Sequence, residues 1–208
     1  MAFNQDNIDP SLRNTGYEII FCKTINLEFR VYKDTSDSNE SGTKAVWVRV
    51  LTKKGDNNKM IQVKFEVMDD ADLFTIYESV FNEQSFNEMK AEDQLLIDFQ
   101  DFPNNVTELL NESESSDSQT QITFVQEDDQ SMTMEFLQIL ELKAVEIFKL
   151  KFIPSNEVFI QDQVQFRYNK IKEMLKYKKE FLTEFDRQVQ SKNPILAKSL
   201  KSPRHPRK

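Results

Sequence analysis

Few side chains in this sequence have the chemistry of a catalytic or metal-binding site. Its 208 residues include a single cysteine, Cys22, a single histidine, His205, and three glycines. A serine or cysteine nucleophile needs an imidazole base beside it, a zinc site needs several Cys or His ligands, and a phosphate-binding loop needs closely spaced glycines. The composition therefore argues against enzymes of these classes, predicts no cofactor, and leaves carboxylates as the candidate reactive groups.

Two groups of carboxylates stand out by their positions. Asp69, Asp70 and Asp72 precede a segment with helical spacing, so we interpret them as a turn and a helix N-terminal cap rather than a metal site. Asp98 lies between apolar residues in a predicted short strand, where a buried carboxylate needs partners. We expect backbone N–H groups to bind Asp98, assign no catalytic role to either group, and predict that the protein is not an enzyme.

The elements that position these residues are predicted from hydrophobic periodicity. Short apolar segments, several of them alternating with polar residues, predict antiparallel strands. They cover 25–31, 46–50, 61–67, 122–126, 132–140 and 145–153. Between the first three and the last three, a helical insertion is predicted over 70–110.

The insertion contains several separate signals. Apolar residues spaced by three and four predict a helix over 70–81, and Ser85 with Glu88 has the form of a capping box for a second helix. The apolar run 95–99 predicts a short strand, and Pro103 suits the first turn of a further helix.

After Pro154 the period changes to that of a coiled coil. Apolar residues follow each other at alternating intervals of four and three, with one lysine among them. They are Val164, Tyr168, Ile171, Leu175, Lys178, Leu182, Phe185 and Val189. This seam predicts a helix that pairs with a second copy, and the alternative is one amphipathic helix packed on the sheet.

Charge is unevenly distributed along the chain, whose formal net charge is −8. Residues 91–141 contain thirteen acidic side chains and no Lys or Arg, and the last seventeen residues contain six Lys or Arg and no acid. Three prolines prevent a continuous helix in this tail. The pattern indicates either a soluble acidic head with an ordinary Lys-rich helix, or a tail that contacts an acidic partner such as tubulin, nucleic acid or a neighbouring head.

These features divide the chain into four parts. We expect a flexible N-terminus over 1–16, a β-rich head over 17–156, an amphipathic or coiled-coil helix over 157–191, and a disordered basic tail over 192–208. The single cysteine and the polar N-terminus without a secretory pattern predict a reducing, cytoplasmic environment.

Residues 69–110 resemble the head domain of the centriolar cartwheel protein family called spindle assembly abnormal protein 6. The family's stretch has a DD-x-D turn, aromatic-rich helical segments and an LL-x-DF-x-x-FP run that ends in LL. The matching residues are Asp69, Asp70, Asp72, Phe74, Tyr77, Phe86, Leu95, Leu96, Asp98, Phe99, Phe102, Pro103, Leu109 and Leu110. Weaker similarity extends the alignment to about 17–180.

The sequence also departs from the family. Leu73 stands where the family often has proline, the acidic loop 111–121 is not a family feature, and the family's long coiled coil is missing. We interpret the chain as the short form called "like", rather than as a shortened piece of a longer protein.

The resemblance implies an α+β, mainly β fold. The expected head is an antiparallel β-barrel or sandwich with an inserted helix–turn–helix, as in the scaffold proteins of non-homologous end joining, followed by a stalk helix. Most apolar motif residues are expected in its core: Phe74, Tyr77, Leu95, Leu96, Phe99, Phe102 and Leu110.

The resemblance also implies a site of head–head contact. In the family, an apolar residue enters a pocket on the neighbouring head, and its spacing from Pro154 places it at Leu142, followed by Lys143. Leucine buries less area than an aromatic ring, so the contact would be weaker. The alternative is that Leu142 caps the core at the end of a strand.

The implied function is a self-associating structural scaffold of the centriole or basal body, or of a related flagellar or apical structure, in the cytoplasm and cytoskeleton. Expected partners are further copies of the chain and other centriolar or microtubule-associated proteins. Small molecules, membranes and nucleic acid are not expected partners. The alternatives are a DNA-repair scaffold of the same superfamily, with which the basic tail is compatible, and a hydrolase that uses carboxylates.

Overall fold

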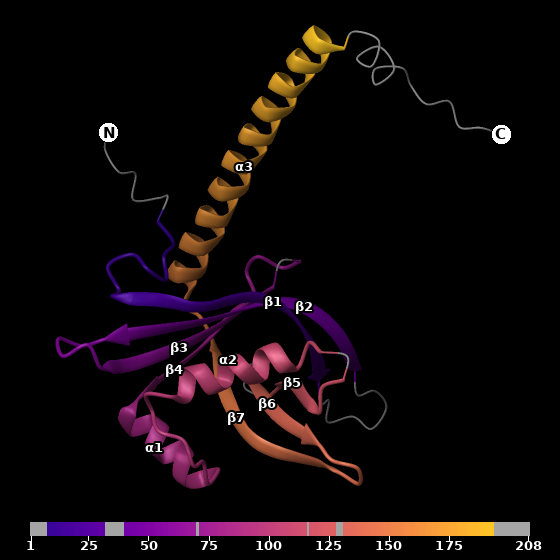
Figure 1. Ribbon diagram of the computed structural model, residues 1–208. Helices are drawn as coiled ribbons and strands as arrows, with labels where there is room; N and C mark the ends of the chain where they lie inside the picture. The colour runs from indigo at the N-terminus through magenta and orange to yellow at the C-terminus, as the bar shows by residue number, and fades with distance from the viewer. Residues whose placement is uncertain (1–7, 32–39, 70, 116, 128–130, 194–208) are drawn as a thin grey trace. The chain divides into compact units, whose positions relative to one another are not determined.

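The computed structural model contains two compact units, one formed by Ile8–Val164 and the other including 165–192. It describes residues 8–31, 40–69, 71–115, 117–127 and 131–193 (Figure 1). Asp70 and almost all of the predicted basic tail lie outside these residues. The two units are described separately below.

The first unit is a closed barrel of seven strands in the order β1-β2-β3-β4-β7-β6-β5. The strands are β1 (Tyr17–Val31), β2 (Glu40–Lys54), β3 (Met60–Asp69), β4 (Ile76–Asn82), β5 (Thr120–Gln126), β6 (Met132–Ile139) and β7 (Ala144–Pro154). All neighbouring pairs are antiparallel except β1 and β5, which run parallel. The predicted mainly β head with antiparallel strands is confirmed.

Alternation along the strands builds the core. Ile25 and Leu27 of β1, and Val46, Val48 and Val50 of β2, are at most 1% exposed, because every second side chain of a strand points to the same face. The remaining space is filled by aromatic rings from strands and helices. The fully buried ones are Phe65, Phe86, Phe102, Phe124, Phe136 and Phe152.

Two short helices cover the barrel where its strands separate (Figure 1). Strands β4 and β7 pair only at Tyr77 with Pro154 and at Glu78 with Ile153. The helices α1 (Glu83–Glu92) and α2 (Phe102–Glu112) follow β4 in sequence. They add buried rings, such as Phe102, to the core.

The helix starts differ in detail from the prediction. Asn82, not Ser85, is the N-cap of α1: its side chain accepts the Ser85 N–H at 2.9 Å, and the Asn82 N–H donates to Ser85 Oγ at 3.0 Å. The capping box is therefore real but begins three residues earlier. Pro103 lies in the first turn of α2, as predicted.

Two predicted elements of the insertion are wrong. The predicted helix over 70–81 is replaced by a turn and strand β4, which pairs with β3 from Gln62 to Met68. Ile76 and Val80 fit helical spacing, but pairing with β3 decides the conformation. The predicted strand 95–99 is an irregular connection between α1 and α2.

A network of buried charges lies on the outer face of β2, β3 and β4. Arg49 on β2 lies directly opposite Glu66 on β3, and Glu66 lies directly opposite Glu78 on β4. Arg49 Nη2 lies 2.9 Å from Glu66 Oε2, and Lys64 Nζ lies 3.1 Å from Glu66 Oε1 and 2.5 Å from Glu78 Oε2. Glu66 is fully buried and Arg49 is 4% exposed, so each charge needs the others as partners.

The same network binds the N-terminal segment and the first turns of α3 (Glu157–Lys192). Arg49 Nη1 contacts Asp9 Oδ2 at 2.7 Å, Ser11 Oγ donates to Glu66 Oε1 at 2.8 Å, and Gln163 Nε2 donates to Asp9 Oδ1 at 2.9 Å. Burial acts to raise the pKa of Asp9, but the charge of Arg49 and the hydrogen bonds from Arg49, Ser11 and Gln163 together lower it. The expected flexible N-terminus over 1–16 is therefore wrong from Asp9 onward.

The second unit holds most of helix α3, a single continuous helix of 36 residues. The Asn156 side chain accepts the Phe159 N–H at 2.9 Å at its start, as an N-cap residue does. Among the described helices, none is both long and apolar enough to cross a lipid bilayer.

The buried network predicts a large loss of stability from Arg49→Met. This change leaves the Glu66 carboxylate buried with fewer partners, which typically costs about 3–5 kcal/mol. Lys54→Met, which breaks an exposed pair with Glu18 at 3.4 Å, should cost less than about 1 kcal/mol. Urea unfolding followed by circular dichroism compares them, and equal losses would show that the network is not a main source of stability.

Candidate functional site

An apolar side chain is almost fully exposed at the tip of the β6–β7 hairpin, after the partly exposed Ile139 and Leu140. The Leu140 N–H donates to the Lys143 carbonyl at 2.9 Å, which closes a tight turn around Glu141 and Leu142. Leu142 is 97% exposed and Lys143 is also exposed. The alternative that Leu142 caps the core is therefore wrong, since the side chain contributes nothing to the interior of its own head.

A shallow apolar recess of about 420 Å³ lies between the α1–α2 connection, α2 and the beginning of β7. Its apolar lining consists of Leu95, Leu96, Ile97, Leu109, Ile147 and Phe148. Phe148 is buried, but Leu96 is 98% exposed. Large apolar side chains exposed together mark interaction surfaces more often than isolated ones do.

Three carboxylates also line this recess: Asp93, Glu108 and Glu112. The backbone N–H of Lys149 on β7 donates to Asp93. Burial, with a smaller effect of the neighbouring Glu92, raises the pKa of the Asp93 carboxyl. Glu108 and Glu112 are exposed on α2, so the recess combines an apolar floor with an acidic border.

The hairpin tip and the recess belong to the same end of the barrel. Strand β7 begins at Ala144, directly after the tip, and its residues Ile147 and Phe148 line the recess. An exposed apolar side chain and an apolar recess are therefore separated by only a few residues of one strand.

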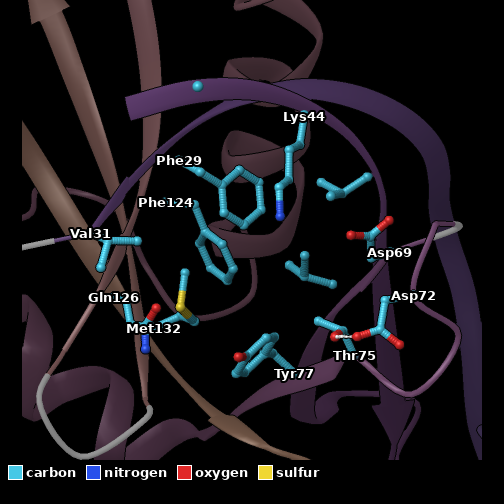
Figure 2. Close-up of a pocket in the computed structure, with 13 residues that line it drawn as sticks. Phe29, Val31, Lys44, Asp69, Asp72, Thr75, Tyr77, Phe124, Gln126 and Met132 are labelled. Carbon is cyan, nitrogen blue, oxygen red and sulfur yellow. Dashed lines mark hydrogen bonds between the residues drawn. The ribbon is translucent and has the colours of Figure 1, made fainter. Parts of the chain in front are cut away.

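A second pocket, of about 520 Å³, opens at the other end of the barrel (Figure 2). It is lined by Phe29, Tyr77, Phe124 and Met132 together with Lys44, whose Nζ lies 5.1 Å from the centre of the Phe29 ring. Met132 begins β6, whereas the hairpin follows the last residue of that strand. Eight residues of strand, roughly 25 Å, thus separate this pocket from Leu142.

Asp69 and Asp72 border this pocket and hold the β3–β4 turn. Asp69 Oδ1 accepts the Ala71 N–H at 2.7 Å, and Asp72 accepts the Phe74 N–H at 3.1 Å and the Thr75 hydroxyl at 2.6 Å. The Thr75 hydrogen bond is the main cause of the lowered pKa of Asp72. The predicted turn is present, but a strand follows it, so the predicted helix cap is wrong.

The predicted seam of α3 forms an exposed apolar stripe. Tyr168, Ile171, Leu175, Leu182 and Phe185 are 48–59% exposed, while Val164 and Val189 are half-buried and Lys178 is exposed. Spacings of four and three place these side chains on one face of a helix. The stripe is therefore available to a second helix.

The motif residues divide between core and surface. Phe99, Phe102 and Leu110 are at most 4% exposed, as expected, and Tyr77, Leu95 and Leu109 pack partly buried against the core. Phe74 is 67% exposed and Leu96 98% exposed, so their predicted burial is wrong.

Asp98 was also expected to be buried, and this is wrong. Its carboxylate is 84% exposed and pairs with Lys90 Nζ at 3.1 Å.

The sequence did not mark Ile97 and Ile147 as recess residues, because no periodic signal identifies an apolar side chain that lines a surface hollow. In the described part of the chain no group of acidic, Cys or His residues is arranged to hold a metal ion.

Comparison with known proteins agrees with this architecture. The family model described as the centriolar protein SAS N-terminal domain matches residues 19–152. A Leishmania SAS-6 N-terminal fragment that contains part of its coiled-coil domain has a TM-score of 0.65 and 18% identity, with 84% of this chain and 99% of that chain covered.

Two further structures give similar values. For the N-terminal coiled-coil dimer of C. elegans SAS-6, the TM-score is 0.62 and the identity 14%, with 79% of this chain and 96% of that chain covered. For the N-terminal domain of Leishmania SAS-6, the TM-score is 0.58 and the identity 22%, with 67% of this chain and 99% of that chain covered. No curated protein matches the chain significantly. The match of the family model over most of the barrel shows that this chain belongs to the centriolar SAS-6 family and carries its N-terminal domain.

Proposed function

We propose that this protein is a self-associating structural scaffold of the centriole or basal body, assembled through one contact between heads and another between helices. The observation that carries the proposal is the fully exposed Leu142 at a hairpin tip, beside an apolar recess of its own head. A single chain cannot fill this recess with its own hairpin tip if the barrel keeps its register, but a second copy can.

In the proposed head–head contact, Leu142 of each copy enters the recess of the other. Such a two-fold contact uses the same patch on both partners, and this arrangement is compact when the inserted side chain and the recess lie close together. The tip and the recess meet this condition, whereas the pocket at the other end of the barrel does not.

The energy of this contact is modest. Removing one leucine side chain from water contributes roughly 1.5–3 kcal/mol, and the association of two proteins costs more than that in lost freedom of motion. The exposed Leu96 and the half-buried Ile97 and Ile147 must contribute as well. We therefore expect a weak contact that is sensitive to each of these positions.

In the proposed stalk contact, the α3 stripes of two copies form a parallel coiled coil. The C. elegans SAS-6 fragment is a coiled-coil dimer, and the seam of this chain has the alternating spacing of four and three that is typical of coiled coils. It spans fewer than four heptads and includes Lys178, and a lysine in the seam lowers stability. Two different two-fold contacts on one chain then propagate alternately into a ring or filament.

Localisation tests the cellular part of the proposal. A fluorescently tagged chain should concentrate in centriolar or basal-body foci. A nuclear signal without such foci would instead support the DNA-repair alternative.

We predict that Leu142→Glu removes the head–head contact. The substitution places an unpaired carboxylate in an apolar recess, so association should weaken at least tenfold, whereas Leu142→Phe should strengthen it if the recess admits the ring. Sedimentation equilibrium measures the change in the full chain that also carries Leu175→Ser and Leu182→Ser, so that only head contacts remain. Unchanged association would exclude Leu142 from the contact, and circular dichroism checks the fold.

The recess half of the contact gives a second prediction. Leu96→Glu should weaken the same association about as much as Leu142→Glu, because it charges the surface that the inserted leucine meets. Phe74→Glu, at an exposed aromatic residue of the β3–β4 turn, is the control and should have little effect. Equal effects of the two changes would argue against this recess.

The stalk contact gives a third prediction. Leu175→Ser together with Leu182→Ser removes two apolar side chains from each helix of the seam, and should abolish stalk pairing at micromolar concentration. The far-ultraviolet spectrum should keep its β contribution, since neither residue belongs to the barrel unit. If Leu142→Glu is added and the mass remains that of a dimer, the stripe is not the pairing surface.

A further inference from the structure

The helical insertion of the head is strongly acidic. Residues 83–112 contain eight Asp or Glu and one basic residue, Lys90, which pairs with Asp98. Three of these carboxylates, Asp93, Glu108 and Glu112, line the recess described above, and no described lining residue is Lys or Arg. A second head that approaches this recess therefore meets a mainly acidic surface, with Lys149 of β7 as a nearby cation that acts on Asp93.

The hairpin tip has a cation at the position that could balance this charge. Lys143, which directly follows Leu142, is exposed. Glu141 directly precedes Leu142, so the leucine stands between opposite charges in the sequence. Within the described residues, neither Lys143 nor Glu108 forms an ion pair. Both ends of a complementary pair are thus present in one chain and are not used there.

We propose that Lys143 of one copy pairs with the carboxylates at the border of the recess of the other copy, and that this pairing sets the orientation and the partner choice of the head–head contact. The inference rests on the proposed insertion of Leu142. A leucine entering an apolar recess is compatible with several orientations, because hydrophobic contact has no direction. The opposite charges of Glu141 and Lys143 restrict this freedom, since they favour the orientation that brings the lysine toward Glu108 and Glu112 on α2 and keeps the glutamate away from them.

The charge pair also affects partner choice. Complementary charges speed association and exclude partners that present like charges. A head with an acidic residue after its inserted side chain would be repelled by this recess, even if its apolar residue fitted. The occupant of the recess is therefore a head with a basic residue at this position, as in a second copy of this chain.

The test uses the full chain with Leu175→Ser and Leu182→Ser, in which only head contacts remain. Lys143→Glu should weaken association by roughly three- to tenfold, the range expected for loss and reversal of an exposed ion pair. Added salt should weaken the self-association of the parent protein. It should strengthen the self-association of the Lys143→Glu variant or leave it unchanged, because salt screens attraction and repulsion alike. Lys44→Glu makes the same change of charge at the other end of the barrel, and should alter the affinity less than twofold.

A charge exchange separates direct pairing from a general charge effect. Glu108→Lys alone should weaken self-association, whereas an equimolar mixture of the Lys143→Glu and Glu108→Lys chains should associate about as strongly as the parent. In the mixed pair, each residue 143 faces a residue 108 of opposite charge. Glu112→Lys serves as the second recess variant, and circular dichroism confirms that each protein is folded.

The outcomes distinguish the two proposals. If Leu142→Glu abolishes association while Lys143→Glu does not weaken it, or if neither recess variant restores association in the mixture, the charge pairing is wrong and the head–head contact stands. If Leu142→Glu has no effect, the head–head contact itself is wrong.

Discussion

The packing of Phe102 holds the head together. Its ring is fully buried and lies 4.9 Å from that of Phe86, 5.7 Å from Phe65, 5.8 Å from Phe81 and 6.0 Å from Phe148. These rings come from α1, β3, β4 and β7, so one side chain of α2 joins both helices to three strands. The contact is needed because β4 and β7 pair at only two positions, and a barrel open at that seam would expose its core.

The same packing creates the candidate site. With α2 fixed against β7 through Phe102 and Phe148, the connection between the two helices must pass over the start of β7, and its apolar residues line the recess there. On another face of the barrel, the Arg49 and Glu66 network fixes the N-terminal segment and the first turns of α3. Apolar packing and buried charge thus stabilise different parts of one unit.

The proposed function rests on side chains that remain exposed after folding. A head of this size buries its core phenylalanines but leaves Leu142 and Leu96 almost fully exposed, and the stripe on α3 half exposed. Burying such side chains is favourable only in an assembly.

The sequence by itself determined most strands of the barrel, the helix with Pro103 in its first turn and the apolar stripe of α3, since a hydrophobic period or a proline marks each of them. It did not determine the conformation of 70–81, where Ile76 and Val80 fit a helix but β3 offers a strand partner. It also could not separate Phe102 from Leu96: both are large and apolar, yet one is 0% and the other 98% exposed. Only the tertiary structure decided this, because burial depends on which surfaces meet in space, and hydrophobicity along the chain does not contain that information.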